Sequence, residues 1–261
     1  MIPAIASSIN PILPGLGGAA ITALQVGATL TSFSAETNPE TTAQYSKFAP
    51  RELTEGLEKK MISSRDGMTL IYLPAFVTSS ILHFQSAEPT LATTFVIVHF
   101  LKRLFEVFFV HKYSGNVSFG LSAGIGIYYA LASLLICSAS FPADFSSPVT
   151  IIGSALFSIG LLGNFYHHKL LADLRNTKKN DGDKYVAPRG GLFEYVAAPH
   201  YFFELLGWLG IAIVSQQANS YLVFTSMSSY LAGRSVAQNK WNRSKFSEWP
   251  EDRKNIVPFV F

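Results

Sequence analysis

Seven apolar segments dominate this chain of 261 residues. A helix that crosses a bilayer needs about 20 mostly apolar residues. Segments of this kind cover residues 16–33, 67–84, 91–111, 117–138, 148–168, 193–215 and 218–235. Charged residues make up 14% of the chain, whereas a soluble domain carries about a quarter. The sequence therefore predicts an all-α integral membrane protein with seven transmembrane helices.

The basic residues between these segments predict the orientation of the chain. Lys and Arg occur in 34–66, 112–116, 169–192 and the tail from 234, but not in 85–90, 139–147 or 216–217. Cytosolic segments are enriched in Lys and Arg. We therefore expect a lumenal N-terminus, a cytosolic C-terminus and a single membrane domain over residues 1–261. Residues 51–60 predict a short helix on the membrane surface.

The third apolar segment carries His99, Lys102, Arg103 and Glu106. Ionisable residues inside a bilayer are costly, so they indicate a functional site by default. At helical spacing His99, Arg103 and Glu106 share one face, and Lys102 with Glu106 forms an i, i+4 pair. Alternatively, this helix is charge-compensated for packing, or its Lys and Arg extend to the cytosolic interface. Four such groups within eight residues favour function.

Polar residues also follow helical spacing in the fifth and sixth segments. Asn164, His168 and Arg175 lie along one stripe that ends at the cytosolic side, which suits a ligand with an anionic end. In the sixth segment His200 and Glu204 are four residues apart. The alternative for the first group is ordinary basic residues at a helix end.

The pair Gly190–Gly191 predicts a turn or a close backbone approach before the sixth segment. Pro199 predicts a bend or a freed carbonyl within it. Tyr201 and Trp208 share a face with Glu204, although an aromatic belt would also explain the two rings.

Several familiar cofactor and metal motifs are missing from the sequence. Six histidines occur without an HExxH motif, and Cys137 is the sole cysteine, so we predict no metal site. The glycines from Gly15 follow no predicted strand and open no βαβ unit. A nicotinamide cofactor would therefore bind without a Rossmann domain.

Motifs in residues 160–261 resemble the steroid 5α-reductase family, that is, the 3-oxo-5α-steroid 4-dehydrogenase C-terminal region. They are Gly163–Asn164 with His168 and Leu174–Arg175; Tyr185 and Pro188 before GlyGlyLeuPhe; Pro199–His200–Tyr201 with Glu204 and Trp208; and the ending TrpPro…ArgLysAsnIleValProPheValPhe. The string from His99 to Gly115 resembles the very-long-chain trans-2-enoyl-CoA reductase branch even more.

The resemblance implies a multi-pass enzyme of the endoplasmic reticulum membrane that binds NADPH in a cavity open to the cytosol. It would reduce a carbon–carbon double bond conjugated to a carbonyl in a lipid, with hydride going to the β-carbon. By family position the cofactor residues would be Asn164, His168, Arg175, Tyr185, His200, Glu204 and Arg234, with Arg103 beside them. Tyr201 matches the tyrosine proposed as proton donor in enoyl-CoA reductases, and Lys102 with Arg103 matches the basic pair of that branch.

The substrate side departs from the steroid pattern. Where steroid reductases hold the 3-keto oxygen with a Glu and a Tyr, this chain has Tyr72 and Phe100. Tyr72 is therefore a second candidate for the acid. His168 replaces an Asp of the steroid enzymes, and Gln238 and Asn242 replace residues that are often His and Tyr.

Three other hypotheses stay open. A long-chain trans-2-enoyl-CoA would be reduced by the same chemistry, and the basic segments could bind its phosphates. A non-enzymatic transporter could use the intramembrane charges as a relay, but no internal repeat is visible. A seven-helix receptor fits the orientation, although the charges cluster in the cytosolic half. The expected partners are a hydrophobic small molecule and membrane lipid, with no nucleic acid.

Overall fold

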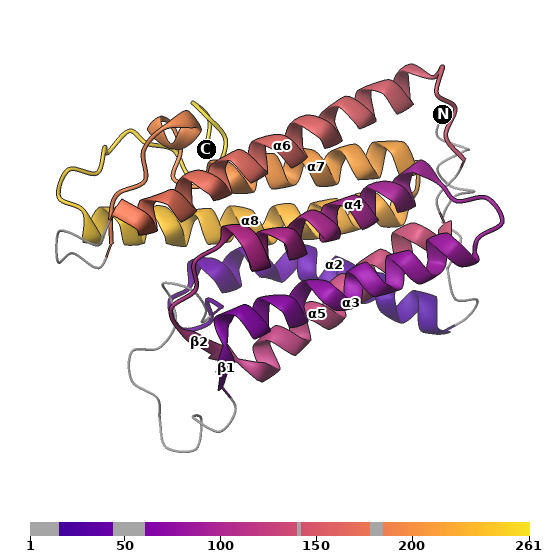
Figure 1. Ribbon diagram of the computed structural model, residues 1–261, viewed down its shortest axis with the longest axis horizontal. Helices are drawn as coiled ribbons and strands as arrows, with labels where there is room; N and C mark the ends of the chain where they lie inside the picture. The colour runs from indigo at the N-terminus through magenta and orange to yellow at the C-terminus, as the bar shows by residue number, and fades with distance from the viewer. Residues whose placement is uncertain (1–15, 44–60, 140–141, 178–184) are drawn as a thin grey trace.

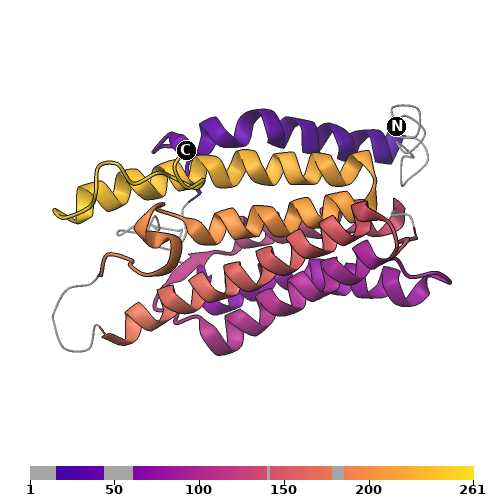
Figure 2. The same ribbon diagram turned by 90° about the horizontal axis from the view of Figure 1, so that it is seen from above.

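The computed structural model describes residues 16–43, 61–139, 142–177 and 185–261, so the predicted surface helix at 51–60 lies outside the described residues. The described part contains seven α-helices that run nearly parallel in one bundle (Figures 1 and 2). They are α2 (Leu16–Thr37), α3 (Ser64–Gln85), α4 (Leu91–Phe105), α5 (Phe119–Ala139), α6 (Pro148–Thr177), α7 (Pro199–Ser215) and α8 (Ala218–Lys245).

Each of the seven apolar segments predicted from the sequence forms a helix over most of its length. Two helices run further than the apolar pattern, because α6 continues to Thr177 and α8 to Lys245 with polar last turns. The predicted start of the sixth segment at residue 193 is wrong. Residues 191–194 form a separate 3₁₀ turn, η5 (Gly191–Glu194), and α7 begins at Pro199. Proline suits the first position of a helix, since its missing N–H needs no partner there, so no bend within α7 is required.

Local capping explains where two of the helices begin. Ser63 caps α3: its Oγ accepts from the Asp66 N–H at 3.1 Å and donates to the Asp66 carboxylate at 2.7 Å. Thr90 caps α4 by accepting from the Thr93 N–H at 3.2 Å. Such caps satisfy backbone donors that have no partner inside the helix. A short antiparallel ladder, β1 (Met61–Ser63) with β2 (Asn116–Ser118), ties the starts of α3 and α5 together.

Small residues set the spacing of the central helices. α6 lies along α7, α2 along α8 and α3 along α5 (Figures 1 and 2). A side chain at Gly160 of α6 would collide with the backbone of Gly207 in α7. Glycine at this crossing therefore lets the two helices approach closely, and this brings the polar residues of α6 and α7 to one interface.

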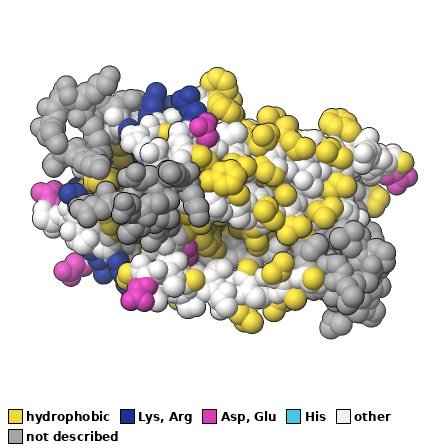
Figure 3. Space-filling view, turned by 90° about the horizontal axis from the view of Figure 1, so that it is seen from below, with side chains coloured by type: hydrophobic (Ala, Val, Ile, Leu, Met, Phe, Trp, Pro, Cys, Tyr) yellow, Lys and Arg dark blue, Asp and Glu magenta, His cyan; other side chains and the backbone are white. Residues whose placement is uncertain are grey.

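Three described helices are long and apolar enough to cross a membrane by length and composition: Ser64–Gln85, Phe119–Ser138 and Pro148–Arg175. On the face shown in Figure 3, hydrophobic side chains cover most of the length of the molecule, and the Lys and Arg side chains gather at one end.

Candidate active site

A buried carboxylate, Glu106, is the centre of a network between α4 and α6. Its side chain has no exposed surface, and Lys102 Nζ lies 3.0 Å from Oε1. Arg103 Nη1 lies 2.7 Å from Oε2, and His168 Nδ1 of α6 lies 3.0 Å from Oε1. Lys102, Arg103, Glu106 and His168 are called the Glu106 network below. Lys102 and Glu106 form the i, i+4 pair that the spacing predicts.

The helix changes its winding at this carboxylate. Residues Glu106–Val110 form a π-helical turn, η3, in which His111 N–H donates to the Glu106 carbonyl at 2.8 Å. π-turns are rare and occur often at functional sites. This π-turn follows the end of α4 and places His111 beside the Glu106 network.

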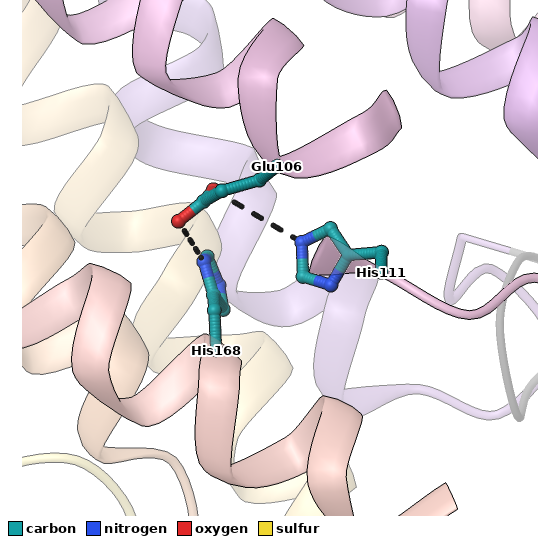
Figure 4. Close-up of side chains that lie close together, drawn as sticks. All are labelled: Glu106, His111 and His168. Carbon is teal, nitrogen blue, oxygen red and sulfur yellow. Dashed lines mark hydrogen bonds and ion pairs between the residues drawn. The ribbon is translucent and has the colours of Figure 1, made fainter. Parts of the chain in front are cut away.

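Figure 4 shows Glu106 between two histidines of different elements. His111 Nε2 lies 4.0 Å from Oε2, and donor atoms of Glu106, His111 and His168 all lie within 4.8 Å of one another. Three such donors could hold a metal ion by distance alone. The same carboxylate already contacts Lys102 and Arg103, whose positive charges would repel a divalent cation. We therefore interpret the cluster as an ion-pair network.

Asn164 connects the Glu106 network to the start of α7. Lys102 Nζ donates to its Oδ1, and its Nδ2 donates to the His200 carbonyl at 2.8 Å. The two bonds fix the amide orientation, because each amide atom has a partner of the matching kind. Rings of His168 and His200 lie beside each other, with centroids 5.4 Å apart.

Glu204 forms a second buried polar group with α4. His99 Nε2 lies 3.3 Å from Glu204 Oε1, and Trp208 Nε1 donates to the same oxygen at 3.2 Å. His99 thus pairs across to α7, although it shares a helix face with Arg103 and Glu106. The shared face predicted its inward orientation but not its partner.

Tyr72 lies between the Glu106 network and a group of aromatic rings. Arg103 Nη2 donates to the Tyr72 hydroxyl, and its guanidinium lies 4.6 Å from the centre of that ring. The rings of Tyr72 and Tyr129 are 6.1 Å apart, and Tyr129 stacks on Trp208 at 6.5 Å. Phe100 is fully buried in this core.

Tyr129 also lines a cavity of about 350 Å³ between α2, α5 and α8. Glycine and apolar side chains form most of its wall, including Gly124 and Met227. Its polar edge is formed by Tyr128 and Ser226, which both donate to Gln25 Oε1 at 2.9 Å. The rings of Tyr72 and Tyr129 thus lie in contact between Arg103 and this apolar cavity.

The remaining predicted residues lie outside the Glu106 network and make other contacts. Tyr201 is half-buried, with its ring 4.2 Å from that of His200. Arg175 is exposed in the last turns of α6, and Tyr185 packs against Trp241 at 4.9 Å. Arg234 is buried on the opposite side of α8, where it pairs with Glu36 of α2 at 3.0 Å and donates to the Ala43 carbonyl at 2.7 Å.

Sequence patterns indicated neither His111 nor two further residues of this region, Tyr113 and His167. Burial raises the pKa of the Tyr113 phenol to about 12, and its hydroxyl is buried with no hydrogen-bond partner in the described part of the chain. His167, next to His168, accepts from the Leu192 N–H at 3.0 Å and lies 2.7 Å from the Gly163 carbonyl. It thereby attaches η5 to α6. The φ angles of Gly190 and Gly191, +86° and +53°, confirm the turn expected there.

These features define a class of helical protein with apolar outer surfaces and a dense network of ionisable groups inside. One known family matches this chain over most of its length. The model for 3-oxo-5-alpha-steroid 4-dehydrogenase matches residues 110–261, more than half of the chain. The chain belongs to this family.

Individual relatives carry two kinds of name. A 3-oxo-5-alpha-steroid 4-dehydrogenase 1 of Homo sapiens is 39% identical over 118 residues, which is 44% of this chain and 44% of that protein. Steroid 5-alpha-reductase DET2 of Solanum lycopersicum is 36% identical over 42% of each chain. A very-long-chain enoyl-CoA reductase of Dictyostelium discoideum is 25% identical over 74% of this chain and 67% of that protein. The chain matches less than half the length of the steroid enzymes.

Proposed function

We propose that this chain is an NADPH-dependent reductase of a carbon–carbon double bond conjugated to a carbonyl in a lipid. The observation that carries the proposal is the buried Glu106 network in a member of this family. Lys102, Arg103 and His168 meet there at one carboxylate, beside Asn164 and His200. Buried ionisable groups with specific partners are typical of catalytic sites.

The residues present suit a dinucleotide cofactor. Arg175 at the exposed end of the α6 stripe would bind a phosphate, and Asn164, His168, Tyr185, His200 and Glu204 would contact the rest. The buried Tyr113 hydroxyl, which has no partner among the described residues, offers a further donor. When bound, NADPH supplies the hydride. Arg234 pairs with Glu36. It would support cofactor binding either indirectly, by holding α8 in place, or directly, after leaving Glu36 for the cofactor.

The substrate carbonyl would be held by a hydroxyl donor. Because Arg103 donates to the Tyr72 oxygen, the phenolic hydrogen of Tyr72 is available to a second acceptor. A donor placed where negative charge develops stabilises the enolate oxygen in the transition state. Tyr201, which lies beside His200, is the alternative to Tyr72 as the acid that gives the proton to the α-carbon. The apolar cavity behind Tyr129 would take the hydrocarbon part of the substrate.

A trans-2-enoyl-CoA is the second candidate substrate. It is favoured by the relative from Dictyostelium discoideum, whose similarity extends over 74% of this chain. The same hydride and proton transfers would act on the thioester enone. The apolar cavity favours a lipid but does not select the head group.

Consumption of NADPH by the purified protein tests the proposal. A steroid enone and a long-chain enoyl-CoA should be run side by side, with Lys102→Met as the inactive control. We expect NADPH loss with at least one of them and none with its saturated analogue. NADPH that neither binds nor reacts with any conjugated lipid would favour the transporter hypothesis.

We further propose seven spans in the endoplasmic reticulum membrane, with the N-terminus lumenal. The support is the one-sided distribution of basic residues and the parallel bundle. Single cysteines in a Cys137→Ser background would test this orientation. A cysteine at Ser247 should react with an impermeant reagent from the cytosolic side, and one at Ser86 only from the lumenal side. Labelling of both from the same side would reject an odd number of spans between them.

A further inference from the structure

A second hollow, of about 240 Å³, lies where α8 ends. It is formed by segment 187–189, which precedes η5, and by the turn 245–253. The C-terminal segment folds back beside residues 195–198, and Ala197 N–H donates to the Lys254 carbonyl at 2.8 Å. Figure 1 shows these segments together at one end of the bundle. None of the residues assigned to the cofactor lines this hollow. Its cations lie on the basic segments that could also bind the phosphates of a CoA substrate, so for a soluble nucleotide this inference rests on the proposed function.

Arg253 forms the buried wall of the hollow, with 5% of its surface exposed. Its guanidinium carbon lies 4.2 Å from the centre of the Trp249 ring. Trp249 is itself fixed, because its Nε1 donates to Asn239 Oδ1 at 2.8 Å. The guanidinium is therefore held in place by a rigid aromatic surface.

The charge of Arg253 is only weakly compensated. The nearest carboxylate oxygen in the described part of the chain, on the partly exposed Glu194, is 3.6 Å away, and the Pro188 carbonyl is 3.5 Å away. Arg253 Nε is buried and has no hydrogen-bond partner within the described residues. Burial lowers the pKa of this guanidinium; the Glu194 carboxylate raises it in part, and nearby Arg189 lowers it. A buried donor without a partner is costly and calls for a specific explanation.

Two more cations line the same hollow. Arg189 and Lys245 are exposed at its rim, and among the described residues Glu248 is the sole acidic one that lines it. The wall is therefore net positive and contains an arginine whose fork of donors suits a phosphate. A pocket for a drug-sized ligand has about 300–1,000 Å³, so this smaller hollow fits a phosphate and a little of the group that carries it.

We propose that this hollow, the Arg253 site, binds a phosphate monoester. Arg253 supplies donors from the buried wall, and Arg189 and Lys245 supply charge at the rim. The phosphate could belong to a soluble nucleotide or to the head group of an anionic lipid at the membrane surface. Both sources present the same dianionic chemistry to the site.

Binding measurements on the purified full chain separate these sources. One arm titrates adenosine 3′,5′-bisphosphate against adenosine by calorimetry. The other compares retention of phosphatidic acid with that of phosphatidylcholine by native mass spectrometry. The test variant is R189Q/K245Q, and Arg253 is left unchanged because it also contacts Pro188 and Glu194. The matched control is K112Q/K240Q, which removes two exposed cations outside the hollow.

We expect the wild-type protein to prefer at least one phosphate probe over its counterpart. R189Q/K245Q should lose about tenfold or more of that affinity, since charge-assisted contacts are lost, and K112Q/K240Q less than about threefold. Preferred binding of adenosine 3′,5′-bisphosphate alone would identify the ligand as a soluble nucleotide. Preferred retention of phosphatidic acid alone would identify it as a lipid head group. No preference in either arm, or equal losses in both variants, would overturn the proposal. Binding that persists unchanged in R189Q/K245Q would do the same, because it belongs to another site.

Discussion

Arg103 determines what the hydroxyl of Tyr72 can do. It donates to the phenol oxygen and also contacts Glu106 and His168. Tyr72 is thus held by a cation that is itself held by a buried carboxylate. A hydroxyl oriented in this way keeps its hydrogen for a substrate oxygen.

Replacing Tyr72 by Phe should therefore lower kcat by about 10²-fold, which is typical for the loss of one donor to a developing oxyanion. The Kd for NADPH should change less than about twofold, because Arg103 loses the Tyr72 hydroxyl but keeps its contacts with Glu106 and His168. Steady-state kinetics and cofactor titration check both values. Tyr221→Phe, on the exposed side of α8, is the control. A full rate in Tyr72→Phe together with a complete loss in Tyr201→Phe would assign the donor to Tyr201 instead.

Replacing Glu106 by Gln should destabilise the protein strongly. The change leaves Lys102 and Arg103 buried without their shared counter-charge. Removing one partner of a buried ion pair costs about 3–5 kcal/mol. Thermal unfolding in detergent should show the loss, whereas Glu88→Gln, at an exposed turn, should leave the midpoint unchanged. Equal midpoints for both variants would show that the network is not held together by this carboxylate.

Metal removal distinguishes the two readings of the Glu106, His111 and His168 group. If the group is an ion-pair network, dialysis against EDTA should leave the unfolding midpoint and turnover unchanged. A lower midpoint that zinc restores would instead identify a metal site.

The sequence predicted the side chains of this centre better than their partners. Lys102 and Glu106 pair within one helix, so their spacing was sufficient. His99 pairs with Glu204 from another helix, and this depends on how α4 is rotated against α7. Tyr113 and His111 follow a π-turn that no periodic pattern indicates. The spacing of polar residues also could not indicate the partner of Arg234, because Glu36 comes from a helix almost 200 residues earlier in the chain.

At the scale of the elements, apolar length predicted which segments are helices and turn chemistry set their ends. The exception is the start of α7, where apolar character extends over residues 193–198 but the Gly190–Gly191 turn imposes η5 before Pro199. Apolar content alone could not separate these two elements. The packing of α2 against α8 and of α3 against α5 was also beyond the sequence, because every helix has apolar residues on several faces.

α5 offers an element-scale test of the apolar cavity. A Cβ atom added at Gly124 would meet no atom within 4 Å, and this residue lines the cavity, so a longer side chain there has the cavity to extend into. Gly124→Leu should therefore fold normally and raise KM for a lipid substrate about tenfold or more, by occupying its space. Gly27→Leu on α2 is the matched control, because that position is equally open and lies outside the cavity wall. Equal kinetics in the two variants would place the substrate elsewhere.

At the scale of the whole molecule, charge and apolar surface are arranged along one axis. Apolar side chains cover much of the bundle on the face in Figure 3, and basic side chains gather at one end. The Glu106 network lies inside, between α4, α6 and α7, and the apolar cavity opens between α2, α5 and α8. A lipid substrate and a water-soluble cofactor would thus approach the centre by different routes.

Transfer of deuterium from NADPH labelled at its hydride position into the product tests this account most directly. The purified protein should give a saturated carbonyl lipid with one deuterium on the carbon β to the carbonyl. The α-hydrogen should come from solvent. Product without label, or no product from any conjugated lipid while NADPH remains bound, would contradict the central claim that the buried polar centre reduces an enone.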